Sequence, residues 1–562
     1  PIMEWLPAYR RDWLVTDILA GLAVWAVMVP EGMAYSSIVG VPPIMGLYTI
    51  VPPLVIYALF GSSRSLVIGP DTATGLISAL TVGALVAQGT PDYNLLTSTL
   101  AVLIGAFFLA FGALRMGWVA AFIPTPVMRG FIEGLVCVTI IGQVPHLLGI
   151  AGTSGNFVTK LWFVLQHLWE ASPAPVATGL LSLAAMLLLR HVAPKLPAAL
   201  VVAVAATILV GLVGGEAAGI SVVGPLPSGL PHLTMPDLSP DTLVALAPGA
   251  LAIVLVGYAE ALGAAKAAAM QDGGAIDPNQ ELIAHGIANV SSGLFGGFLV
   301  VGSLSKTSVA MAAGARTQIA NLVAAALCFL TLILLTPLFR GLPHPALAAI
   351  VIAAMLHLSK PEYLRALYDR NRWEFLLAVI VILAELTLGV LQGIALGVVL
   401  ALLLLIYRAS HPRVAVLGQL PGTEAYRDVN VRRDAMTFPG LLIWRPGGDL
   451  FFASIGYAVA GLKRALAASS PPATHVLFNA ESINFIDTSA CDELLNFIRY
   501  LQGRGITIAF ARVRDPVRDR LRSAGIEALV GDANFYERIT DGVRAWQQGS
   551  FHAHSVNKSR VG

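Results

Sequence analysis

Long apolar runs separated by short polar turns make up the chain as far as about residue 410. A helix needs about 20 mostly apolar residues to cross a bilayer. Fourteen segments approach this pattern, and their centres lie near residues 22, 52, 78, 104, 137, 183, 205, 256, 288, 309, 327, 350, 381 and 399. The third and tenth segments are short and interrupted by Gly or Pro. The pattern predicts an α-helical polytopic membrane protein with 14 spans.

After residue 414 the apolar runs shorten. GLLIWRPGG, THVLFNAESINF and ITIAFARV read as strands, and the stretches between them read as amphipathic helices, which predicts a small α/β domain. We therefore expect a transmembrane domain over 1–414, a linker over 415–430, a soluble domain over 431–548 and a disordered tail over 549–562.

Composition agrees with this division. Hydrophobic residues make up 56% of the chain and charged residues only 12%, against about 25% charged in a typical soluble protein. Residues 1–414 hold 18 of the 35 Lys and Arg residues, and the much shorter remainder holds 17. Cys137, Cys328 and Cys491 lie far apart without metal-ligand spacing. We expect neither a disulfide framework nor a metal site.

The distribution of basic residues predicts the orientation of the spans. If the N-terminus, with Arg10 and Arg11, is cytoplasmic, most other basic residues before residue 414 also fall in inside connections. The outside connections then hold only Lys160 and Arg340, and residues 196–265 contain no Lys or Arg. We expect a cell-membrane protein with both termini in the cytoplasm.

A weak internal repeat relates the two halves of the membrane part. VMVPEGMAY and VGYAEALGA each place a glutamate, Glu31 and Glu260, inside an apolar span. Each is followed by a Gly-broken segment that opens a short helix, SLVIGPDTATGL and FLVVGSLSKTSVAM. Matching features are roughly 230 residues, or seven spans, apart, and an odd number of spans inverts the second copy. Inverted repeats with discontinuous helices are typical of secondary transporters.

The two broken segments predict an anion site. Non-helical backbone at membrane depth is tolerated only where it is buried in protein or lines a wet cavity. The start of each half-helix presents unpaired N–H groups and a partial positive charge. If inversion places Asp71–Ala73 opposite Ser303–Lys306, two positive helix ends face one cavity, which suits an anion. The alternative is that Gly and Pro merely kink packed helices.

Four charged residues make this interpretation more specific. A charge at the bilayer centre costs at least ~2.5–3.5 kcal/mol, so Lys306 should be paired or functional, and we expect Glu260 to be its partner. Glu31 follows a proline in an otherwise neutral span. Because burial favours the protonated form of a carboxyl group, Glu31 is a candidate proton carrier. Asp71 is expected to cap its half-helix and, when ionised, to repel the substrate.

PEGMAYSSIVGVPPIMGLY, FGSSRSLVIGPDTATGL and GSLSKTSVAMAAGART resemble the signature stretches of the sulfate permease (SulP) family of anion transporters, relatives of the animal solute carriers that include pendrin and prestin. The C-terminal segment resembles a STAS domain (sulfate transporter and anti-sigma-factor antagonist). The resemblance spans nearly the whole chain. It implies a seven-plus-seven inverted repeat, a core domain that moves against a gate domain, and usually a homodimer.

The resemblance also implies which residues form the site. Carried over by motif, the anion lies between the starts of the third and tenth helices, and Glu31 and Glu260 face it. The substrate-binding residues are then Asp71, Thr72, Ala73, Gly302, Ser303, Leu304, Ser305 and Lys306. No cofactor and no nucleic acid is implied. Many relatives carry Arg where this chain has Lys306, and an apolar residue where it has Asp71.

These observations predict a secondary active transporter that works by alternating access. The titratable Glu31 and Asp71 favour anion:proton symport, with a small dicarboxylate ahead of bicarbonate and sulfate. Alternatives are an anion channel or exchanger on the same scaffold, and sodium-coupled bicarbonate or sulfate transport. A membrane enzyme would need clustered ligands, and the histidines are scattered.

In the soluble domain, NFIDTSACDEL resembles the loop that is phosphorylated in anti-sigma-factor antagonists. Thr488 and Ser489 are the matching hydroxyls and candidate regulatory sites. The same Asp-Thr-Ser run is an ordinary helix N-cap, which is the interpretation we favour. The domain could also bind a cytoplasmic partner.

Overall fold

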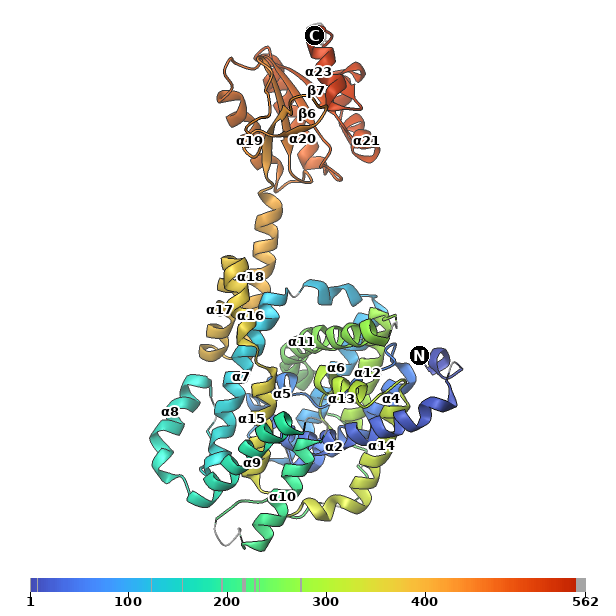
Figure 1. The fold of residues 1–562 in the computed structure, drawn as a ribbon, viewed down its shortest axis with the longest axis vertical. Helices are drawn as coiled ribbons and strands as arrows, with labels where there is room; N and C mark the ends of the chain where they lie inside the picture. The colour runs from blue at the N-terminus through green and yellow to red at the C-terminus, as the bar shows by residue number, and fades with distance from the viewer. Residues whose placement is uncertain are drawn as a thin grey trace. The chain divides into compact units, whose positions relative to one another are not determined.

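The computed structural model describes residues 2–7, 9–122, 124–153, 155–193, 196–214, 219–226, 229–231, 233–272 and 275–551. The chain divides into two units, Pro1–Ala401 and Leu402–Gly562, and each is described by itself. The first unit is a bundle of helices, and the second is a sheet flanked by helices (Figure 1).

The first half of the helical unit runs to residue 212. Its helices are α1 (Ile2–Trp5), α2 (Leu14–Val39), α3 (Pro43–Tyr48), α4 (Val51–Phe60), α5 (Thr72–Gly83), α6 (Pro91–Ala113), α7 (Thr125–Leu148), α8 (Phe157–His167), α9 (Pro173–Val192) and α10 (Ala198–Leu212). Single 3₁₀ turns are η1 (Arg11–Trp13), η2 (Gly117–Phe122) and η3 (Leu168–Glu170).

The second half begins with a 33-residue helix, α11 (Pro240–Asp272). It continues through α12 (Pro278–Leu294), α13 (Leu304–Ala312), α14 (Ile319–Leu330), a π turn η4 (Thr331–Leu335), a 3₁₀ turn η5 (Thr336–Phe339), α15 (His344–Leu358), α16 (Pro361–Arg370), α17 (Arg372–Thr387) and α18 (Val390–Ser410).

Each of the fourteen predicted centres falls inside one of these helices. Within the described residues, nine helices are long and apolar enough to cross a membrane, and α5 and α10 are shorter apolar helices. The polytopic helical architecture is as the sequence predicts, whereas the count of 14 spans stays a prediction. The amphipathic helix α8 was not among the predicted segments.

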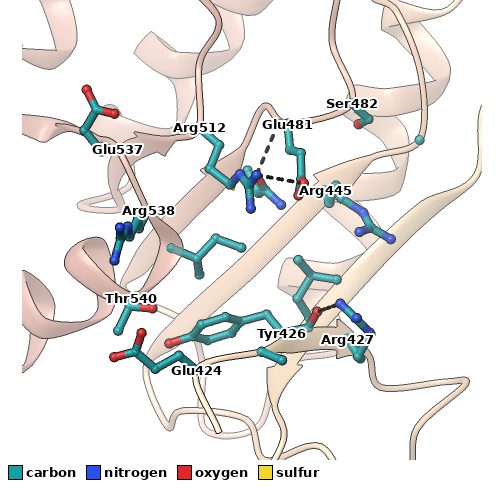
Figure 2. Close-up of a pocket in the computed structure, with 15 residues that line it drawn as sticks. Glu424, Tyr426, Arg427, Arg445, Glu481, Ser482, Arg512, Glu537, Arg538 and Thr540 are labelled. Carbon is teal, nitrogen blue, oxygen red and sulfur yellow. Dashed lines mark hydrogen bonds and ion pairs between the residues drawn. The ribbon is translucent and has the colours of Figure 1, made fainter.

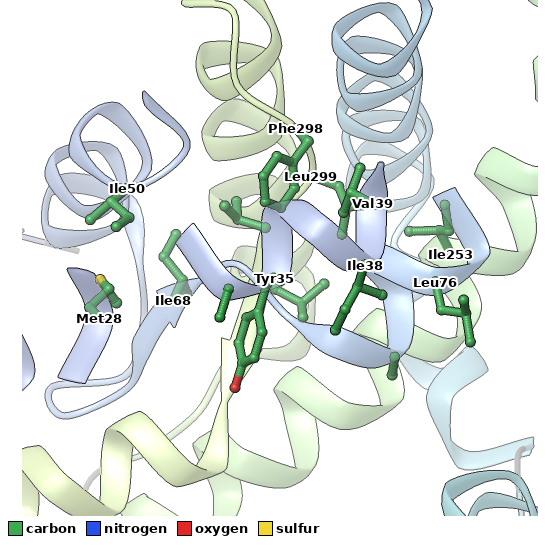
Figure 3. Close-up of a cluster of buried hydrophobic side chains, with 14 of the residues drawn as sticks. Met28, Tyr35, Ile38, Val39, Ile50, Ile68, Leu76, Ile253, Phe298 and Leu299 are labelled. Carbon is green, nitrogen blue, oxygen red and sulfur yellow. The ribbon is translucent and has the colours of Figure 1, made fainter. Parts of the chain in front are cut away.

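The core of the helical unit surrounds α2. Figure 3 shows Met28, Tyr35, Ile38 and Val39 of this helix packed among buried side chains that come from distant parts of the chain. These neighbours include Ile50, Ile68, Leu76, Ile253, Phe298 and Leu299. Because α2 contacts segments from both halves, it holds the two broken segments in one compact region.

The second unit contains a six-stranded sheet of order β4-β3-β5-β6-β7-β8. Its strands are β3 (Val414–Gln419), β4 (Tyr426–Asp428), β5 (Leu441–Pro446), β6 (His475–Asn479), β7 (Thr507–Ala511) and β8 (Phe535–Tyr536). β3 pairs antiparallel with β4 and β5, and β5 to β8 are parallel. The helices are α19 (Ile455–Ala467), α20 (Thr488–Gly503), α21 (Asp515–Ser523), α22 (Ile526–Val530) and α23 (Ile539–Gln547), and η6 (Asp532–Asn534) is a 3₁₀ turn.

Alternation along the strands sorts their side chains onto two faces. Leu442 and Trp444 pack with the apolar sides of α19 and α20, while Leu441 and Ile443 face the cluster that includes α23. The βαβα alternation predicted from the sequence is therefore present, with helices on both faces of the sheet.

Residues 415–430, expected as a linker, instead supply β3 and β4 of this sheet. VAVLGQ alternates buried and partly buried positions, and β3 pairs with β5 through Val416 and Trp444. This segment forms a strand because it pairs with β5, which is distant in sequence. The local sequence pattern does not show this pairing. The expected disordered tail 549–562 lies mostly outside the described residues, and Phe551 packs beside His475 and Tyr536.

Candidate functional site

Two short strands bring the broken segments together. β1 (Val67–Gly69) pairs antiparallel with β2 (Val301–Ser303), and the register places Val67 opposite Ser303 and Gly69 opposite Val301. Each strand leads into a half-helix, β1 through Pro70 and Asp71 into α5, and β2 directly into α13. The ribbon is three residues long, so the two helix starts lie on the order of 10 Å apart along it. The structure thus places the two half-helices as the repeat predicts.

The start of α5 is capped by a carboxylate. Asp71 is the N-cap, and its Oδ2 accepts hydrogen bonds from the Thr74 backbone N–H and the Thr74 hydroxyl, both at 3.1 Å. Thr72 and Ala73, the first two helical residues, are buried. Their N–H groups have no partner within the helix. The expected capping role of Asp71 is therefore present, and it places a negative charge beside these donors.

The start of α13 is capped by a hydroxyl. Ser303 is the N-cap, and its Oγ lies 3.5 Å from the backbone N of Lys306 and 3.1 Å from the Ser305 Oγ. The Thr307 hydroxyl donates to the Ser303 carbonyl at 2.6 Å and accepts from the Val67 N–H at 3.0 Å. Thr307 thereby ties the first turn of α13 to β1. Leu304 and Ser305 remain exposed at the start of the helix.

Lys306 crosses from α13 to the other half-helix. Its side chain is 2% exposed, and its Nζ lies 3.1 Å from the Pro70 carbonyl oxygen, directly before the cap of α5. The same Nζ lies 3.1 Å from Glu31 Oε2 and 5.1 Å from the centre of the Tyr35 ring. The buried ammonium is therefore paired, as its cost in an apolar environment requires.

The partner of Lys306 differs from the one expected. We predicted Glu260, by analogy between the repeats, and this is wrong because the ion pair is with Glu31 of α2. Glu31 follows Pro30 inside α2 and its side chain is 8% exposed. Lys306 of α13 therefore reaches α2, a helix from the first half of the unit.

Glu260 lies near the same place but makes no ion pair with the described residues. It is half-buried on α11, close enough to Asp71 and Lys306 to interact electrostatically with both. The helix approaches the ribbon very closely. A Cβ on Gly302 would lie 3.0 Å from the Ala261 Cα, and one on Gly257 would lie 2.5 Å from Val301 Cγ1. The backbone contact at Gly302 holds Glu260 beside the two helix starts.

Two further residues belong to this region and were missed by the sequence reasoning. Tyr35 lies four residues after Glu31, one helical turn along PEGMAY, so its spacing was a usable signal. Arg190 of α9 lies within electrostatic range of Tyr35, and its Nη1 donates to the Ala353 carbonyl at 2.9 Å. Nothing local to Arg190 in the sequence indicates this contact.

The charges around Lys306 determine whether an anion is attracted or repelled there. Three carboxyl groups (Glu31, Asp71 and Glu260) surround a single ammonium, Lys306. If all four are ionised, they carry a net of two negative charges, which the guanidinium of Arg190, within electrostatic range of Tyr35, offsets in part. Protonation of a carboxyl group reduces that negative charge, and protonation of Glu31 also leaves the ammonium without its counter-charge.

Two other buried carboxyl groups of the helical unit, Glu281 and Glu385, do not join this cluster. Glu281 accepts hydrogen bonds from the Tyr57 hydroxyl at 2.9 Å and from the Ser62 N–H at 2.9 Å, which ties α12 to the end of α4. Glu385 is fully buried on α17, and neither of its oxygens has a hydrogen-bond partner among the described residues. Within the described ranges, no three His, Cys, Asp or Glu side chains are grouped to hold a metal ion.

In the second unit, Asp487 caps α20. Its Oδ1 accepts from the Ala490 N–H at 2.7 Å and its Oδ2 from the Phe452 N–H at 2.9 Å. Thr488 and Ser489 are exposed. The run therefore works as a helix cap, and modification of either hydroxyl stays a prediction.

Comparison with known proteins decides the family. The pattern that defines the sulfate permease family matches residues 14–381, and the pattern of the STAS domain matches residues 432–542. The chain belongs to the sulfate permease family. A protein of this family from Mycobacterium tuberculosis strain H37Rv, named a probable sulfate transporter, is 34% identical over 96% of both chains. Sulfate transporter 4.1 of Arabidopsis thaliana is 30% identical over 98% of this chain and 82% of its own length.

Solved structures of the family share the fold. The chain matches SLC26A9 with a TM-score of 0.91 at 20% identity, covering 98% of this chain and 93% of that one. The transmembrane domain of a cyanobacterial bicarbonate transporter, BicA, matches with a TM-score of 0.63 at 23% identity, over 68% of this chain and 98% of that one. The protein is thus a multi-pass membrane anion transporter with the SLC26 transporter fold and a C-terminal STAS domain, as the sequence motifs predicted.

Proposed function

We propose that the protein is a secondary active transporter that moves a small anion together with a proton by alternating access. The observation that carries this proposal is the buried Lys306–Glu31 ion pair, 3.1 Å long, at the junction of two half-helix starts. The N–H groups of Thr72 and Ala73 on one side and of Leu304 and Ser305 on the other supply donors for the anion. Lys306 supplies the charge.

The ion pair gives a physical reason for coupling. While Glu31 is ionised, it neutralises Lys306, and the remaining carboxylates of Asp71 and Glu260 repel an anion. When Glu31 is protonated, Lys306 becomes the counter-charge of the substrate. Because a buried charge without a partner costs several kcal/mol, the proton and the anion bind best together. Glu260 is a second candidate for a coupling group, since it interacts with both Asp71 and Lys306.

The substrate is proposed from the chemistry of the site and from the family. Lys306 is a point charge that does not impose the two-pronged geometry of an arginine, which suits a carboxylate of varied shape. On that basis a small dicarboxylate is ahead of bicarbonate and sulfate. The names of the relatives from M. tuberculosis and A. thaliana favour sulfate, so the three anions must be compared in one experiment.

Uptake into proteoliposomes tests both claims. We expect labelled succinate, bicarbonate or sulfate to accumulate in a saturable manner, and an imposed inward proton gradient to accelerate uptake of the preferred anion. The control replaces the proton gradient with a sodium gradient of equal size. Proton coupling is contradicted if only the sodium gradient accelerates uptake, and symport is contradicted if uptake requires an anion loaded on the opposite side.

An anion channel on the same scaffold is the second candidate. It is favoured by the exposure of Leu304 and Ser305 at the start of α13, which leaves the helix end open. Planar-bilayer recording separates the two, since a channel gives unitary currents and a transporter gives saturating flux without them. We further propose cytoplasmic termini, from the charge asymmetry of the connections, and a homodimer, from the family resemblance.

A further inference from the structure

Two exposed phenylalanines lie at one edge of the second unit. Phe452 is 74% exposed and Phe485 is 53% exposed, and no other phenylalanine among the described residues is as exposed. Phe452 follows β5 and Phe485 follows β6, and these two strands are parallel neighbours in the sheet. The carboxyl ends of parallel strands meet at the same edge of a sheet. The fold therefore places both rings at the carboxyl edge of the sheet.

The loops that carry the two rings are bonded to each other. The Asp449 carboxylate accepts from the Phe485 N–H at 3.0 Å, and the Asp487 carboxylate accepts from the Phe452 N–H at 2.9 Å. The Leu450 N–H also donates to the Phe485 carbonyl at 3.1 Å. These bonds order the backbone but leave both rings uncovered. An apolar pair presented by an ordered scaffold points to an interaction surface.

The chain enters the sheet from α18 at the same edge. The second unit begins at Leu402, inside α18, and this helix ends at Ser410. β3 begins at Val414, and its register places Val414 opposite Pro446, the last residue of β5. A chain of this length spans at most about 14 Å between Ser410 and Val414. The end of α18 therefore lies close to the carboxyl edge of the sheet.

Aromatic contacts also join the end of α18 to the start of α19. The Tyr407 ring stacks on the His411 ring, with their centres 4.3 Å apart, and the His411 ring centre lies 4.9 Å from that of Tyr457. Tyr457 is in the first turn of α19, and Phe452 lies five residues before it. The last turn of α18 and the loop that carries Phe452 thus occupy one small region of the unit.

The bilayer extends to the last turn of α18. The apolar stretch Gln392–Ser410 has 19 residues, which at 1.5 Å per residue cover ~28 Å, close to the ~30 Å hydrocarbon core of a bilayer. The helix therefore needs its whole length to cross. Leu405, Ile406 and Tyr407 are 55%, 57% and 60% exposed, as expected of side chains that face lipid. Tyrosine is enriched at the boundary between membrane and water, which suits Tyr407.

A polar hollow of the same unit is a separate feature. Figure 2 shows its lining, which includes Arg445, Glu481 and Arg512. Neither Phe452 nor Phe485 is part of this lining. A ligand in the hollow would therefore leave the two rings exposed. The bilayer at the end of α18 is the apolar phase next to them.

We propose that the carboxyl edge of the second unit rests on the phospholipid bilayer, and that Phe452 and Phe485 insert into the lipid headgroup region. Phenylalanine is one of the residues that bury an apolar face at the boundary between headgroups and acyl chains. Arg413 is exposed at the same edge and forms no ion pair with a residue that the structure describes. Its guanidinium supplies a cation for the lipid phosphates.

Spin labelling of the full-length protein in lipid nanodiscs tests the proposal. The parent variant is Cys137→Ser, because Cys137 is exposed whereas Cys328 and Cys491 are buried. Phe452→Cys and Phe485→Cys each add one accessible thiol for the label. The nanodiscs contain equal amounts of phosphatidylcholine and phosphatidylglycerol. Collisions of the label with oxygen, which concentrates in lipid, are compared with collisions with a water-soluble nickel chelate.

We expect both labels to collide several-fold more often with oxygen than with the nickel chelate. Tyr500→Cys is the matched control, because Tyr500 is also an exposed aromatic residue of this unit. It lies ~18 Å along α20 from Thr488, where the helix starts near the carboxyl edge. Its label should collide more often with the nickel chelate. The parent variant should take up no label.

A charge placed beside the label tests whether the two rings insert together. Phe452→Asp should raise the collision rate of the Phe485→Cys label with the nickel chelate several-fold, because a carboxylate is costly to bury in lipid. Tyr500→Asp is the matched control and should leave that collision rate unchanged. Thermal unfolding should be unaltered in both variants, since both side chains are exposed.

The collision rates identify what covers the two rings. Preference for oxygen at both positions, lost at Phe485→Cys when Phe452→Asp is added, supports insertion into the bilayer. Equal or greater collision with the nickel chelate would place the rings in water and overturn the proposal. Shielding from both reagents would mean that protein covers the rings, and an oxygen preference unchanged by Phe452→Asp would mean that they do not insert together; either result overturns it. Anion transport is not measured here, so the proposed transport function stands or fails separately.

Discussion

The helices α5 and α13 begin alike but carry opposite charge at their starts. Each follows a three-residue strand of one ribbon; the cap of α5 is the second residue after its strand, and the cap of α13 is the last residue of its strand. At α5 the cap is a carboxylate, Asp71. At α13 the cap is the hydroxyl of Ser303, and one turn later Lys306 reaches across to the Pro70 carbonyl beside the other helix.

The two helix starts share a backbone arrangement but differ in the charge of their cap residues. Both helix starts present N–H groups to an anion, but Asp71 already occupies part of that position at α5. Lys306 of α13 offsets the negative charge of Asp71, and Lys306 itself forms an ion pair with Glu31. In the proposed mechanism, the shared backbone supplies the anion site, and the unlike side chains make its affinity depend on protonation.

The largest effect on anion uptake is expected when Lys306, the positive residue at these two helix starts, is replaced. Lys306→Ala leaves Glu31 buried without its partner and the helix starts without a cation. We expect anion uptake to fall about 100-fold or more, since breaking a buried pair costs about 3–5 kcal/mol. Uptake in proteoliposomes, normalised to the amount of folded protein, measures this. Lys306→Arg, which keeps the charge, should retain partial uptake, and equal activity of the alanine variant and wild type would refute the role of Lys306.

The next largest effect is expected on stability, from a substitution that pushes the β1–β2 ribbon away from α11. In Gly302→Ala the new Cβ would meet Leu66 Cδ2 at 2.9 Å and the Ala261 Cα at 3.0 Å. Because backbone cannot move aside cheaply, we expect a destabilisation of about 1–3 kcal/mol. Gly83→Ala, at the other end of α5 with nothing within 4 Å of its Cβ, is the matched control. Thermal unfolding in detergent should show a lower Tm for the first variant alone, and equal values would contradict the close packing.

A moderate effect on the apparent KM is expected when the cap of α5, Asp71, is made uncharged like the cap of α13, Ser303. Asn caps a helix about as well as Asp, so Asp71→Asn keeps the hydrogen bond to Thr74 while removing the negative charge. We expect the apparent KM for the anion to fall a few-fold, with little change in Tm. Asp71→Ala also loses the cap and should cost about 1 kcal/mol of stability. A higher apparent KM in Asp71→Asn would contradict the proposed repulsion between Asp71 and the anion.

The smallest effect is expected at the acidic cap of α20, Asp487, which lies outside the anion site. Asp487→Ala should cost about 1 kcal/mol and speed hydrogen exchange in the first turn of α20, because Ala490 and Phe452 lose their acceptor. Thr488→Ala and Ser489→Ala should leave that exchange unchanged, since both side chains are exposed. Protection lost in the Thr488 or Ser489 variant would show that the hydroxyls do the capping.

Much of the fold was readable from the sequence because it depends on local patterns. Apolar runs gave the positions of the helices, and the Gly- and Pro-broken segments gave the two half-helices. The spacing of roughly 230 residues between the broken segments indicated that they face one another. The cap at Asp71 followed from its residue type at a helix start.

What the sequence did not yield depends on contacts between distant residues. The pairing of Lys306 with Glu31 instead of Glu260 follows from how far a four-carbon side chain reaches across the ribbon, which no local pattern encodes. Arg190 reaches the region from α9, and the strand at 414–419 exists because β5 pairs with it.

The direct test of the central claim is proton-driven uptake by Glu31→Gln, with Glu260→Gln as the matched variant. Both are reconstituted beside wild type, and the anion that wild type prefers is followed with and without an inward proton gradient. Wild type should be accelerated by the gradient. Glu31→Gln, which keeps the size of the side chain but cannot titrate, should transport at a rate that no longer depends on the gradient. Full gradient dependence in Glu31→Gln would contradict the coupling of proton and anion through the Lys306–Glu31 pair.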